Sequence, residues 1–112
     1  MTIIQAGALV FCGRWRRVIS LARLARLRWI EERDHRIAIG AGTTVSDLLH
    51  DPRIAAHGAA LVESARQFAG QMVRNTATVA GNVAHGSPAA DLVPPLMALD
   101  AEIALMSKSE TR

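Results

Sequence analysis

The chain has 112 residues, of which 50% are hydrophobic and 21% are charged, and its formal net charge is +3. This composition excludes an intrinsically disordered protein and is typical of one globular domain or part of one. The single cysteine, Cys12, excludes a framework of intramolecular disulfides such as small secreted proteins use.

The charge is distributed unevenly along the chain. Residues 1–36 contain eight arginines and three acidic residues, a net of +5, whereas residues 37–112 contain five basic and seven acidic residues, a net of −2. A basic segment can bind nucleic acid, an anionic membrane or an acidic partner, and it can also be an ordinary solvated surface.

The first residues do not have the pattern of a targeting signal. The apolar run Ala6–Cys12 is too short to cross a bilayer. A signal peptide carries its positive charges before the apolar run, whereas Arg14, Arg16 and Arg17 follow it here. We therefore expect a cytoplasmic protein without a membrane span.

Arg17–Leu21 has β-branched residues at its centre, which predicts a short buried strand. In the next segment, Leu21–Ile30, leucines and arginines recur at a spacing typical of a basic amphipathic helix. Such a helix could lie on anionic lipid or in the groove of a partner. Further on, Arg36–Gly40 alternates isoleucine with other residues, which indicates a strand.

Thr44 and Asp47 mark the start of a helix, because the threonine can cap the first turn and the carboxylate suits the positive end of the helix dipole. This helix is expected to run to about His50 and to stop before Pro52. A second helix is predicted over Ala59–Phe68, with one apolar face formed by Leu61, Val62, Ala65 and Phe68.

The segment Arg74–Asp91 is predicted to be a loop that lies close to a ligand. It is rich in short hydrogen-bonding side chains, namely those of Thr76, Thr78, Asn82 and Ser87. Gly81 and Gly86 lack a Cβ, so the main chain there can adopt positive φ or lie against a bound group. Together with the charge of Asp91, such a loop can hold a polar, phosphate-bearing or hydroxyl-rich ligand. The alternative is an ordinary glycine-rich connection between two elements.

After this loop, a helix is expected from Asp91 to about Leu99, because the two prolines near its start are tolerated in a first turn. Ala101–Met106 is predicted to be a strand with Ile103 and Leu105 on one side. Short strands mixed with short helices indicate the α+β class.

No metal site and no catalytic residue are expected. The histidines His35, His50, His57 and His85 show no metal-ligand spacing, and the lone cysteine adds no further ligand. The sequence also contains no convincing triad or carboxylate pair for nucleophilic or acid–base catalysis.

Two parts of the Arg74–Asp91 segment, Thr78–Asn82 and Ser87–Asp91, resemble the second flavin-binding segment of the molybdenum hydroxylase FAD proteins. That family includes the FAD domain of xanthine dehydrogenase and the medium subunit of carbon monoxide dehydrogenase. Its pattern is Thr/Ser-hydrophobic-Gly-Gly-Asn, a short spacer and Ser-Pro-x-x-Asp. The resemblance runs in collinear order from about Val18 to Met106, and other similar segments are Arg36–Thr44, Ala65–Asn75 and Pro94–Ala101.

The resemblance implies that the chain binds FAD. The residues that would bind the cofactor are Phe68, Thr78, Gly81, Asn82, His85, Ser87 and Asp91. Phe68 matches a family position near the flavin, with a core aromatic as the alternative, and His85 would either hydrogen-bond the cofactor or lie exposed in the loop. Ala80 replaces the first family glycine, and its methyl group would crowd a bound phosphate or ribityl chain unless φ is negative there.

The resemblance also implies a fold. A brief helical turn and a strand over Arg28–Glu32 would form an antiparallel hairpin with Arg36–Gly40, and we favour this hairpin over the amphipathic helix. Residues 17–112 would be part of a FAD-binding domain, mostly the second subdomain of the two-subdomain vanillyl-alcohol oxidase type. Residues 1–16 diverge, because the family's pyrophosphate-cradling glycine segment has only Ala6-Gly7 as its nearest match. We expect a fragment that lacks the family's C-terminal domain.

The function implied is that of the FAD-binding electron-transfer component of an oxidoreductase. A molybdenum-cofactor large subunit and a [2Fe-2S] small subunit would supply electrons to FAD, which would pass them to NAD+ or another acceptor. Because the redox chemistry belongs to the flavin, no catalytic side chain is required. One alternative is a truncated, non-catalytic remnant that does not bind FAD. The other is a basic interaction module that uses Arg14–Arg28, although we expect no nucleic-acid partner because no nucleic-acid-binding motif is present.

Overall fold

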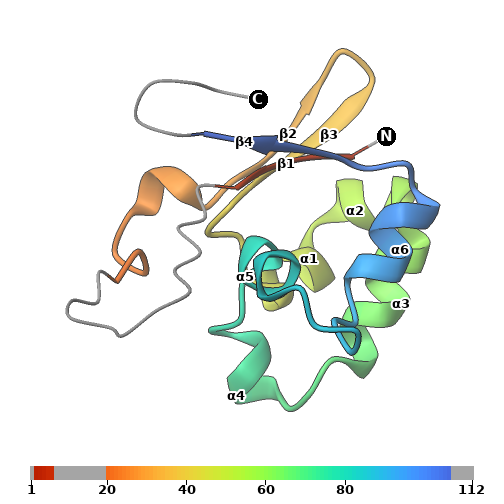
Figure 1. Cartoon of the computed structure of the whole chain (residues 1–112). Coiled ribbons are helices and arrows are strands. Elements are labelled where there is room, and N and C mark those ends of the chain that lie inside the picture. The colour runs from red at the N-terminus through yellow and green to blue at the C-terminus, as the bar shows by residue number, and fades with distance from the viewer. Residues whose placement is uncertain (1, 7–19, 107–112) are drawn as a thin grey trace.

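The computed structural model describes residues 2–6 and 20–106, which form a mixed four-stranded sheet covered on one face by helices (Figure 1). The strands are β1 (Thr2–Ala6), β2 (Ile30–Arg33), β3 (Arg36–Gly40) and β4 (Glu102–Leu105). The helices are α1 (Val45–His50), α2 (Pro52–His57), α3 (Ala59–Gln67), α4 (Gln71–Arg74), α5 (Val79–His85) and α6 (Val93–Ala98), and Ala25–Leu27 forms a 3₁₀ turn, η1. The expected α+β class is confirmed.

The strands lie in the order β2-β3-β1-β4. β2 and β3 are antiparallel, whereas β1 runs parallel to both of its neighbours, β3 and β4. The hairpin is therefore confirmed. The alternative of an amphipathic helix over Leu21–Ile30 is wrong, because the helical part of this segment is only the short turn η1. The carbonyls of Leu27 and Trp29 accept from the amides of Gly42 and Gly40 instead of forming helical hydrogen bonds. The turn residues Asp34 and His35 have φ of 50° and 59°, the left-handed geometry that two-residue hairpin turns favour.

The sheet differs from the sequence prediction at its centre, because β1 occupies the position between β3 and β4 and was not predicted as a strand. Of the strand predicted for Arg17–Leu21, residues 17–19 lie outside the described part of the chain. Ser20 and Leu21 are exposed and belong to no strand, so this end of the prediction is wrong. The place beside β3 that such a strand could take is filled by β1.

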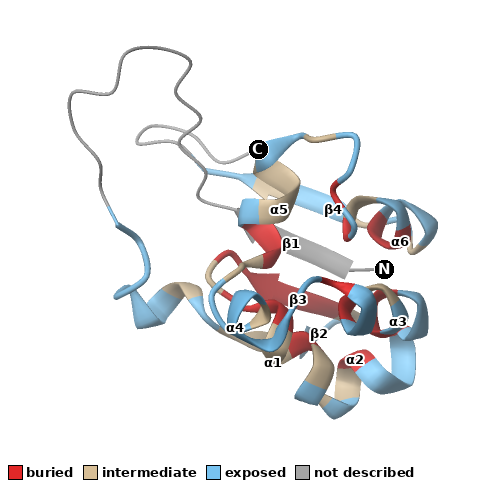
Figure 2. Ribbon diagram, turned by 90° about the horizontal axis from the view of Figure 1, so that it is seen from below, coloured by how far each residue is buried: buried red, intermediate tan, exposed pale blue. Residues whose placement is uncertain are grey.

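The hydrophobic core lies between the sheet and the helices (Figure 2). Ile37 and Ile39 of β3 belong to this core together with residues from α1, α2, α3, α5 and α6. The apolar face predicted for α3 is confirmed, because all four of its residues are buried, namely Leu61, Val62, Ala65 and Phe68. Burying a large aliphatic side chain of this kind stabilises a fold by about 2 kcal/mol.

The predicted start of α1 is confirmed in atomic detail. The amide of Asp47 donates to Thr44 Oγ1 over 3.1 Å, and the amide of Thr44 donates to Asp47 Oδ2 over 2.9 Å, which is a complete capping box. α1 stops before Pro52 as expected, but Pro52 then begins α2, which was not predicted. Asp51 explains this junction, because its carboxylate caps the new helix by accepting from the amides of Arg53 and Ile54.

The prediction of a continuous loop over Arg74–Asp91 is wrong, because Val79–His85 forms helix α5. Its N-cap is Thr78, and its C-cap is Gly86, which has a φ of +63°. The glycines that suggested a loop therefore lie in the first turn of a short helix and at its end. Capping by Thr78 and burial of the apolar side of α5 outweigh the low helix propensity of glycine.

The C-terminal part agrees closely with the sequence prediction. α6 carries two prolines in its first turn, and β4 follows it. Asp91 does not begin α6, however, because Leu92 precedes the helix and no side chain caps its first turn. Ile103 and Leu105 are 44% and 42% exposed, since β4 is an edge strand of the sheet.

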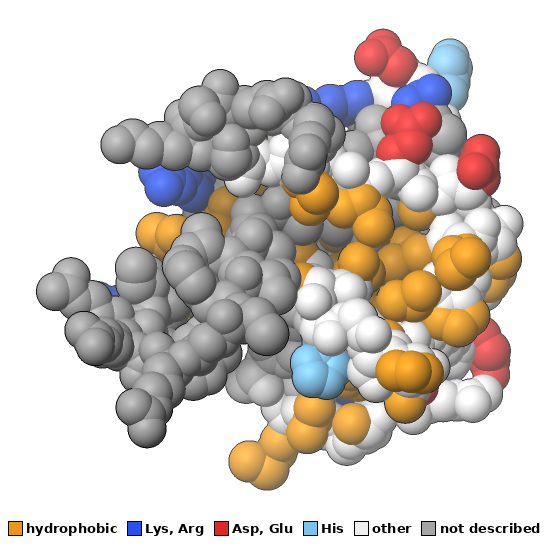
Figure 3. Space-filling view, viewed as in Figure 1, with side chains coloured by type: hydrophobic (Ala, Val, Ile, Leu, Met, Phe, Trp, Pro, Cys, Tyr) orange, Lys and Arg blue, Asp and Glu red, His pale blue; other side chains and the backbone are white. Residues whose placement is uncertain are grey.

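Several large hydrophobic side chains lie on the surface of the helical layer (Figure 3). Met72 and Val73 of α4 and Met97 of α6 are exposed. In the part of the chain that the structure describes, none of the helices has the length and apolar character needed to span a bilayer.

The C-terminal end of α5 provides a test of backbone strain. Gly86→Ala is expected to lower the free energy of unfolding by about 1 kcal/mol, because a side chain at φ +63° is strained. Gly70→Ala is the matched control, because both glycines have open space around the position of a Cβ but Gly70 has a φ of −88°. Urea unfolding measures both variants. Equal losses at the two positions would contradict backbone strain as the cause.

Candidate functional site

The predicted FAD-binding residues on and beside α5 follow one face of this helix. They are Thr78, Gly81, Asn82 and His85, whose spacing of three and four residues matches the helical repeat. The other face of α5 is buried: Val79 packs in the main core, and Ala80 packs against Ala41. Ala80 is helical and buried. Helical residues have negative φ, which is the case in which its methyl group was expected not to crowd a ligand.

Thr78 and Gly81 form the start of this face. The amide of Gly81 donates to Thr78 Oγ1 over 3.0 Å. A Cβ on Gly81 would lie 2.8 Å from the same oxygen, which is closer than atoms in contact allow. Glycine at this position therefore preserves the cap and leaves the Thr78 hydroxyl uncovered on the exposed side of the helix.

Asn82 connects α5 to the loop that follows it. Its Oδ1 accepts a hydrogen bond from the amide of Leu92 over 3.2 Å, so the loop folds back onto the helix. This contact brings Asp91 close to Asn82, although the two residues are nine positions apart in the sequence. The backbone of Asp91 is also held by α3, since Ser64 Oγ donates to its carbonyl oxygen over 2.5 Å. The Asp91 side chain itself is exposed.

Three of the short polar side chains have the same hydrogen-bonding pattern. Thr78, Asn82 and Ser87 each accept a hydrogen bond from a backbone amide, that of Gly81, Leu92 and Ala89 respectively. The hydroxyl hydrogens of Thr78 and Ser87 and the amide hydrogens of Asn82 have no partner among the described residues. This surface therefore presents donors and suits a ligand that is rich in acceptors.

Two predicted site residues are placed differently from the others. Phe68 follows the last turn of α3 and is 8% exposed, in the same core cluster as Val79. It lies beneath the surface and shows no hydrogen bond to the polar side chains of α5. His85 is exposed in the last turn of α5, and its side chain makes no hydrogen bond within residues 2–6 and 20–106. Phe68 thus lies where the core alternative placed it, and His85 is exposed, as its alternative stated.

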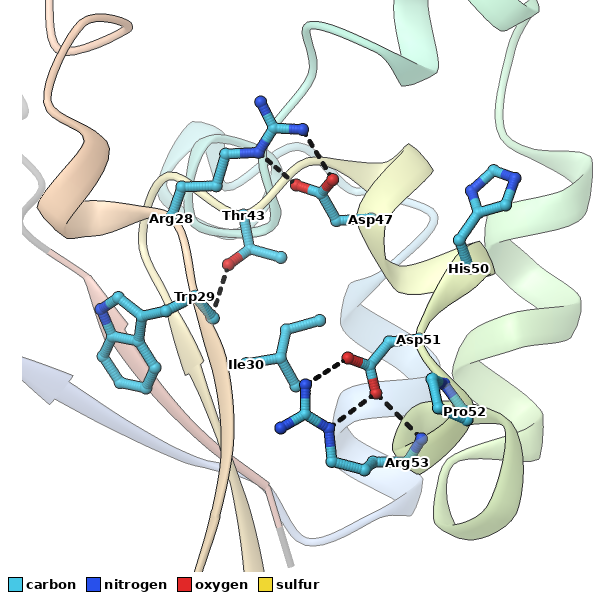
Figure 4. Close-up of a pocket in the computed structure, with 9 residues that line it drawn as sticks. All are labelled: Arg28, Trp29, Ile30, Thr43, Asp47, His50, Asp51, Pro52 and Arg53. Carbon is cyan, nitrogen blue, oxygen red and sulfur yellow. Dashed lines mark hydrogen bonds and ion pairs between the residues drawn. The ribbon is translucent and has the colours of Figure 1, made fainter.

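A hollow of about 320 Å³ lies elsewhere, between the hairpin and helices α1 and α2 (Figure 4). Its lining residues are Arg28, Trp29, Ile30, Thr43, Asp47, His50, Asp51, Pro52 and Arg53. None of the predicted FAD-binding residues belongs to it. Sequence analysis did not find this hollow, because its walls come from the start of the hairpin and from two helices that meet only in the folded chain.

Two arginine–aspartate pairs line the walls of this hollow (Figure 4). Arg28 donates through Nε and Nη2 to the two oxygens of Asp47, both over 2.7 Å. Arg53 donates through Nε and Nη2 to the two oxygens of Asp51 over 3.0 and 2.5 Å. Such bidentate pairs have favourable geometry. The Arg28 pair connects the hairpin to α1, whereas the Arg53 pair holds the cap of α2.

Both carboxyl groups have pKa values below their ordinary range. Burial raises the pKa of Asp47, but the guanidinium of Arg28 and the amide and hydroxyl of Thr44 together lower it further. The Arg53 guanidinium lowers the pKa of Asp51, burial opposes it, and the amides of Arg53 and Ile54 add to the lowering. The charged forms are therefore favoured in the folded state.

These shifts predict a loss of stability in acid. A carboxyl whose folded-state pKa is lowered stabilises the fold above its unfolded pKa of about 3.9, and this contribution disappears as the pH falls through the folded-state pKa. Asp51→Asn retains a capping side chain but removes the charge. It should lower the free energy of unfolding at pH 7 by up to about 1 kcal/mol and should flatten its decline below pH 5.

Urea unfolding between pH 7 and pH 3 measures this effect. Glu63→Gln is the control, because Glu63 lies on the exposed side of α3 and does not cap a helix. An Asp51→Asn variant whose stability declines in acid as steeply as that of the wild type would contradict the assignment to Asp51.

The described residues contain no group of three or more His, Cys, Asp or Glu side chains that could hold a metal ion. The candidate site is the polar face of α5 together with the loop after it, and it presents hydrogen-bond donors around one carboxylate.

Comparison with known proteins identifies the family. Residues 12–112 match the model of the FAD binding domain in molybdopterin dehydrogenase. The putative xanthine dehydrogenase FAD-binding subunit XdhB of Escherichia coli (strain K12) is 35% identical over 100 residues, 88% of this chain and 34% of the relative. The nicotinate dehydrogenase FAD-subunit of Eubacterium barkeri is 34% identical over 102 residues, 88% of this chain and 34% of the relative.

A third relative is the carbon monoxide dehydrogenase medium chain of Hydrogenophaga pseudoflava, which is 35% identical over 88 residues, 79% of this chain and 31% of the relative. The chain thus spans about a third of the length of these relatives. No solved structure matches it. The resemblance inferred from the sequence motifs is confirmed: this chain belongs to the family of FAD-binding domains in molybdopterin dehydrogenases.

Proposed function

We propose that the exposed face of α5 and the α5–α6 loop bind FAD, and that the chain is part of the electron-transfer component of a molybdenum-cofactor dehydrogenase. The observation that carries this proposal is a set of donor hydrogens, on Thr78, Asn82 and Ser87, that have no partner within residues 2–6 and 20–106. The oxygens of the same side chains accept from backbone amides. Family membership supports it, because FAD is the cofactor of that family.

The residues present fit the chemical groups of FAD. Its phosphates, ribityl hydroxyls and flavin carbonyls are acceptors that match donor hydrogens on this face. Exposed Gly81 allows a bound group to approach the helix without a side chain in the way. The carboxylate of Asp91 can accept a hydrogen bond from a cofactor hydroxyl.

Each residue would have a distinct role in holding the cofactor. Thr78, Asn82 and Ser87 would donate hydrogen bonds, and Asp91 would orient a hydroxyl group. Phe68 would support this face from below, because it shares the core with Val79 of α5. His85 would donate from the last turn of the helix. When bound, FAD supplies the electron-accepting and electron-donating chemistry, and the chain supplies binding and orientation.

The wider assembly is part of the same proposal. Among the relatives are a xanthine dehydrogenase FAD-binding subunit, a carbon monoxide dehydrogenase medium chain and a dehydrogenase complex subunit alpha. By analogy, we place this chain beside a molybdenum-cofactor large subunit and a [2Fe-2S] small subunit in the cytoplasm, with NAD+ or another acceptor downstream. The fold would be a partial vanillyl-alcohol oxidase type, with residues 17–112 as the FAD-binding part and residues 1–16 as a divergent segment.

FAD titration of the purified chain tests the binding proposal. Asn82→Asp keeps an oxygen that can accept from the Leu92 amide, but it removes the donor hydrogens and adds a negative charge. We expect the wild type to bind FAD saturably and Asn82→Asp to bind at least about tenfold more weakly, since loss of a well-placed hydrogen bond and repulsion of the phosphates act together. Flavin fluorescence and absorbance follow the binding.

Asn75→Asp is the matched control. Asn75 is exposed, and its Oδ1 also accepts one hydrogen bond, from Gln71 over 3.0 Å, so the substitution makes the same chemical change away from the proposed site. It should bind FAD like the wild type. A folded wild-type chain that binds no FAD would favour the remnant alternative and overturn the proposal. If Asn82→Asp and Asn75→Asp lower the affinity for FAD equally, Asn82 is not a residue of the binding site.

A further inference from the structure

Arg74, the last residue of α4, closes the turn between α3 and α4. Its Nη1 donates to the backbone oxygens of Arg66, Phe68 and Ala69 over 3.1, 3.2 and 3.1 Å, and its Nη2 donates to Gln71 Oε1 over 3.3 Å. The last carbonyls of a helix lack intrahelical partners, and a cation is favourable near them. One guanidinium therefore satisfies the carbonyl end of α3 and fixes the path of the chain around Phe68.

This arrangement has two unfavourable features. Ala69, in the middle of the turn, has a φ of +39°, which is rare for a residue with a side chain. Arg74 Nε is shielded from solvent and has no hydrogen-bond partner in the described part of the structure. Backbone strain and unsatisfied buried donors of this kind concentrate at functional sites, where geometry matters more than stability.

The turn held by Arg74 leads directly to the first residue of the proposed site. The amide of Ala77 donates to the Val73 carbonyl over 2.7 Å, and the carbonyl of Ala77 accepts from the Val45 amide over 3.0 Å. Thr78, the N-cap of α5, follows at once. Hydrogen bonds therefore connect α4 to the turn around Phe68 at one end and to the segment before α5 at the other. These contacts restrict the position of Thr78 relative to that turn.

We infer that Arg74 is a positioning residue of the FAD site: it holds the turn around Phe68 in a fixed relation to Thr78, the N-cap of α5. This inference rests on the proposed function. Arg74 bonds to carbonyl oxygens of its own chain, and its role is to keep the donor face of α5 in the geometry that the cofactor requires.

Two substitutions of Arg74 test the inference in the full chain. Arg74→Met retains much of the side-chain length but removes every donor, and Arg74→Lys retains the charge and part of the donor set. We expect Arg74→Met to weaken FAD binding by about tenfold and to change the visible circular dichroism of the bound flavin, because preorganisation of the site is lost. Arg74→Lys should recover part of the affinity and of the spectrum.

Arg36→Met is the control, because Arg36 pairs with Glu102 over 3.2 Å on the sheet and lies outside the proposed site. It should bind FAD like the wild type. Amide hydrogen exchange of the FAD-free protein adds an independent readout, in which residues 66–78 should exchange faster in Arg74→Met than in Arg36→Met. If Arg74→Met does not fold, Arg74→Lys decides by the same measurements.

The outcomes separate the two proposals. If the wild type binds no FAD, the proposed function fails, and the positioning role fails with it. If the wild type binds FAD and the folded Arg74 variants bind it with the same affinity and the same flavin spectrum, the positioning role alone is overturned. A lower unfolding temperature with unchanged binding has the same meaning, because it shows that Arg74 contributes to stability only.

Discussion

The cross-connection between Thr43–Val45 and Ala77–Val79 is the constraint on which the rest of this structure depends. The amide of Val45 donates to Ala77, the amide of Val79 donates to Thr43, and Thr44 and Thr78 form an isolated antiparallel bridge. Thr44 and Thr78 are also the N-caps of α1 and α5. Two helices that are distant in the sequence therefore begin from one shared pair of backbone segments, directly after the hairpin and directly after α4.

This connection determines which side of α5 is exposed to solvent. Val79 lies in the core between the sheet and the helices, and Ala80 packs against Ala41, just after β3. The polar positions of α5 consequently face outward, with Gly81 uncovered. The short polar side chains stabilise the local backbone with their oxygens, while their donor hydrogens have no partner among the described residues. In the proposed site, one set of residues would therefore serve both folding and binding.

Three arginines, Arg28, Arg53 and Arg74, form hydrogen bonds within the chain. Arg28 and Arg53 form bidentate pairs with Asp47 and Asp51, and Arg74 binds carbonyl oxygens at the end of α3. Each contact connects the end of one element to its neighbour, and the Arg74 contacts also pair backbone carbonyls at the end of α3. Of the basic residues up to position 36, Arg28, Arg33 and Arg36 form ion pairs within the chain, with Asp47, Glu31 and Glu102 respectively.

The sequence by itself determined the local features, because these depend on neighbouring residues. The capping box of Thr44 and Asp47, the buried face of α3 and the short β4 follow from spacing and propensity, and the collinear motifs identified the family. The helical nature of α5 was predictable in part from Thr78 and the i, i+4 pair Val79 and Val83, but its glycines suggested a loop.

Only the tertiary structure decided the features that depend on distant contacts. The central place of β1 arises from parallel pairing with strands more than thirty residues away, which no local pattern encodes. Asn82 reaches the Leu92 amide, and Arg74 reaches the end of α3, only once the helices have packed. The sequence motif therefore identifies the residues of the candidate site, but packing determines their geometry. Hydrogen bonds to backbone groups require partners that only the folded chain brings within reach.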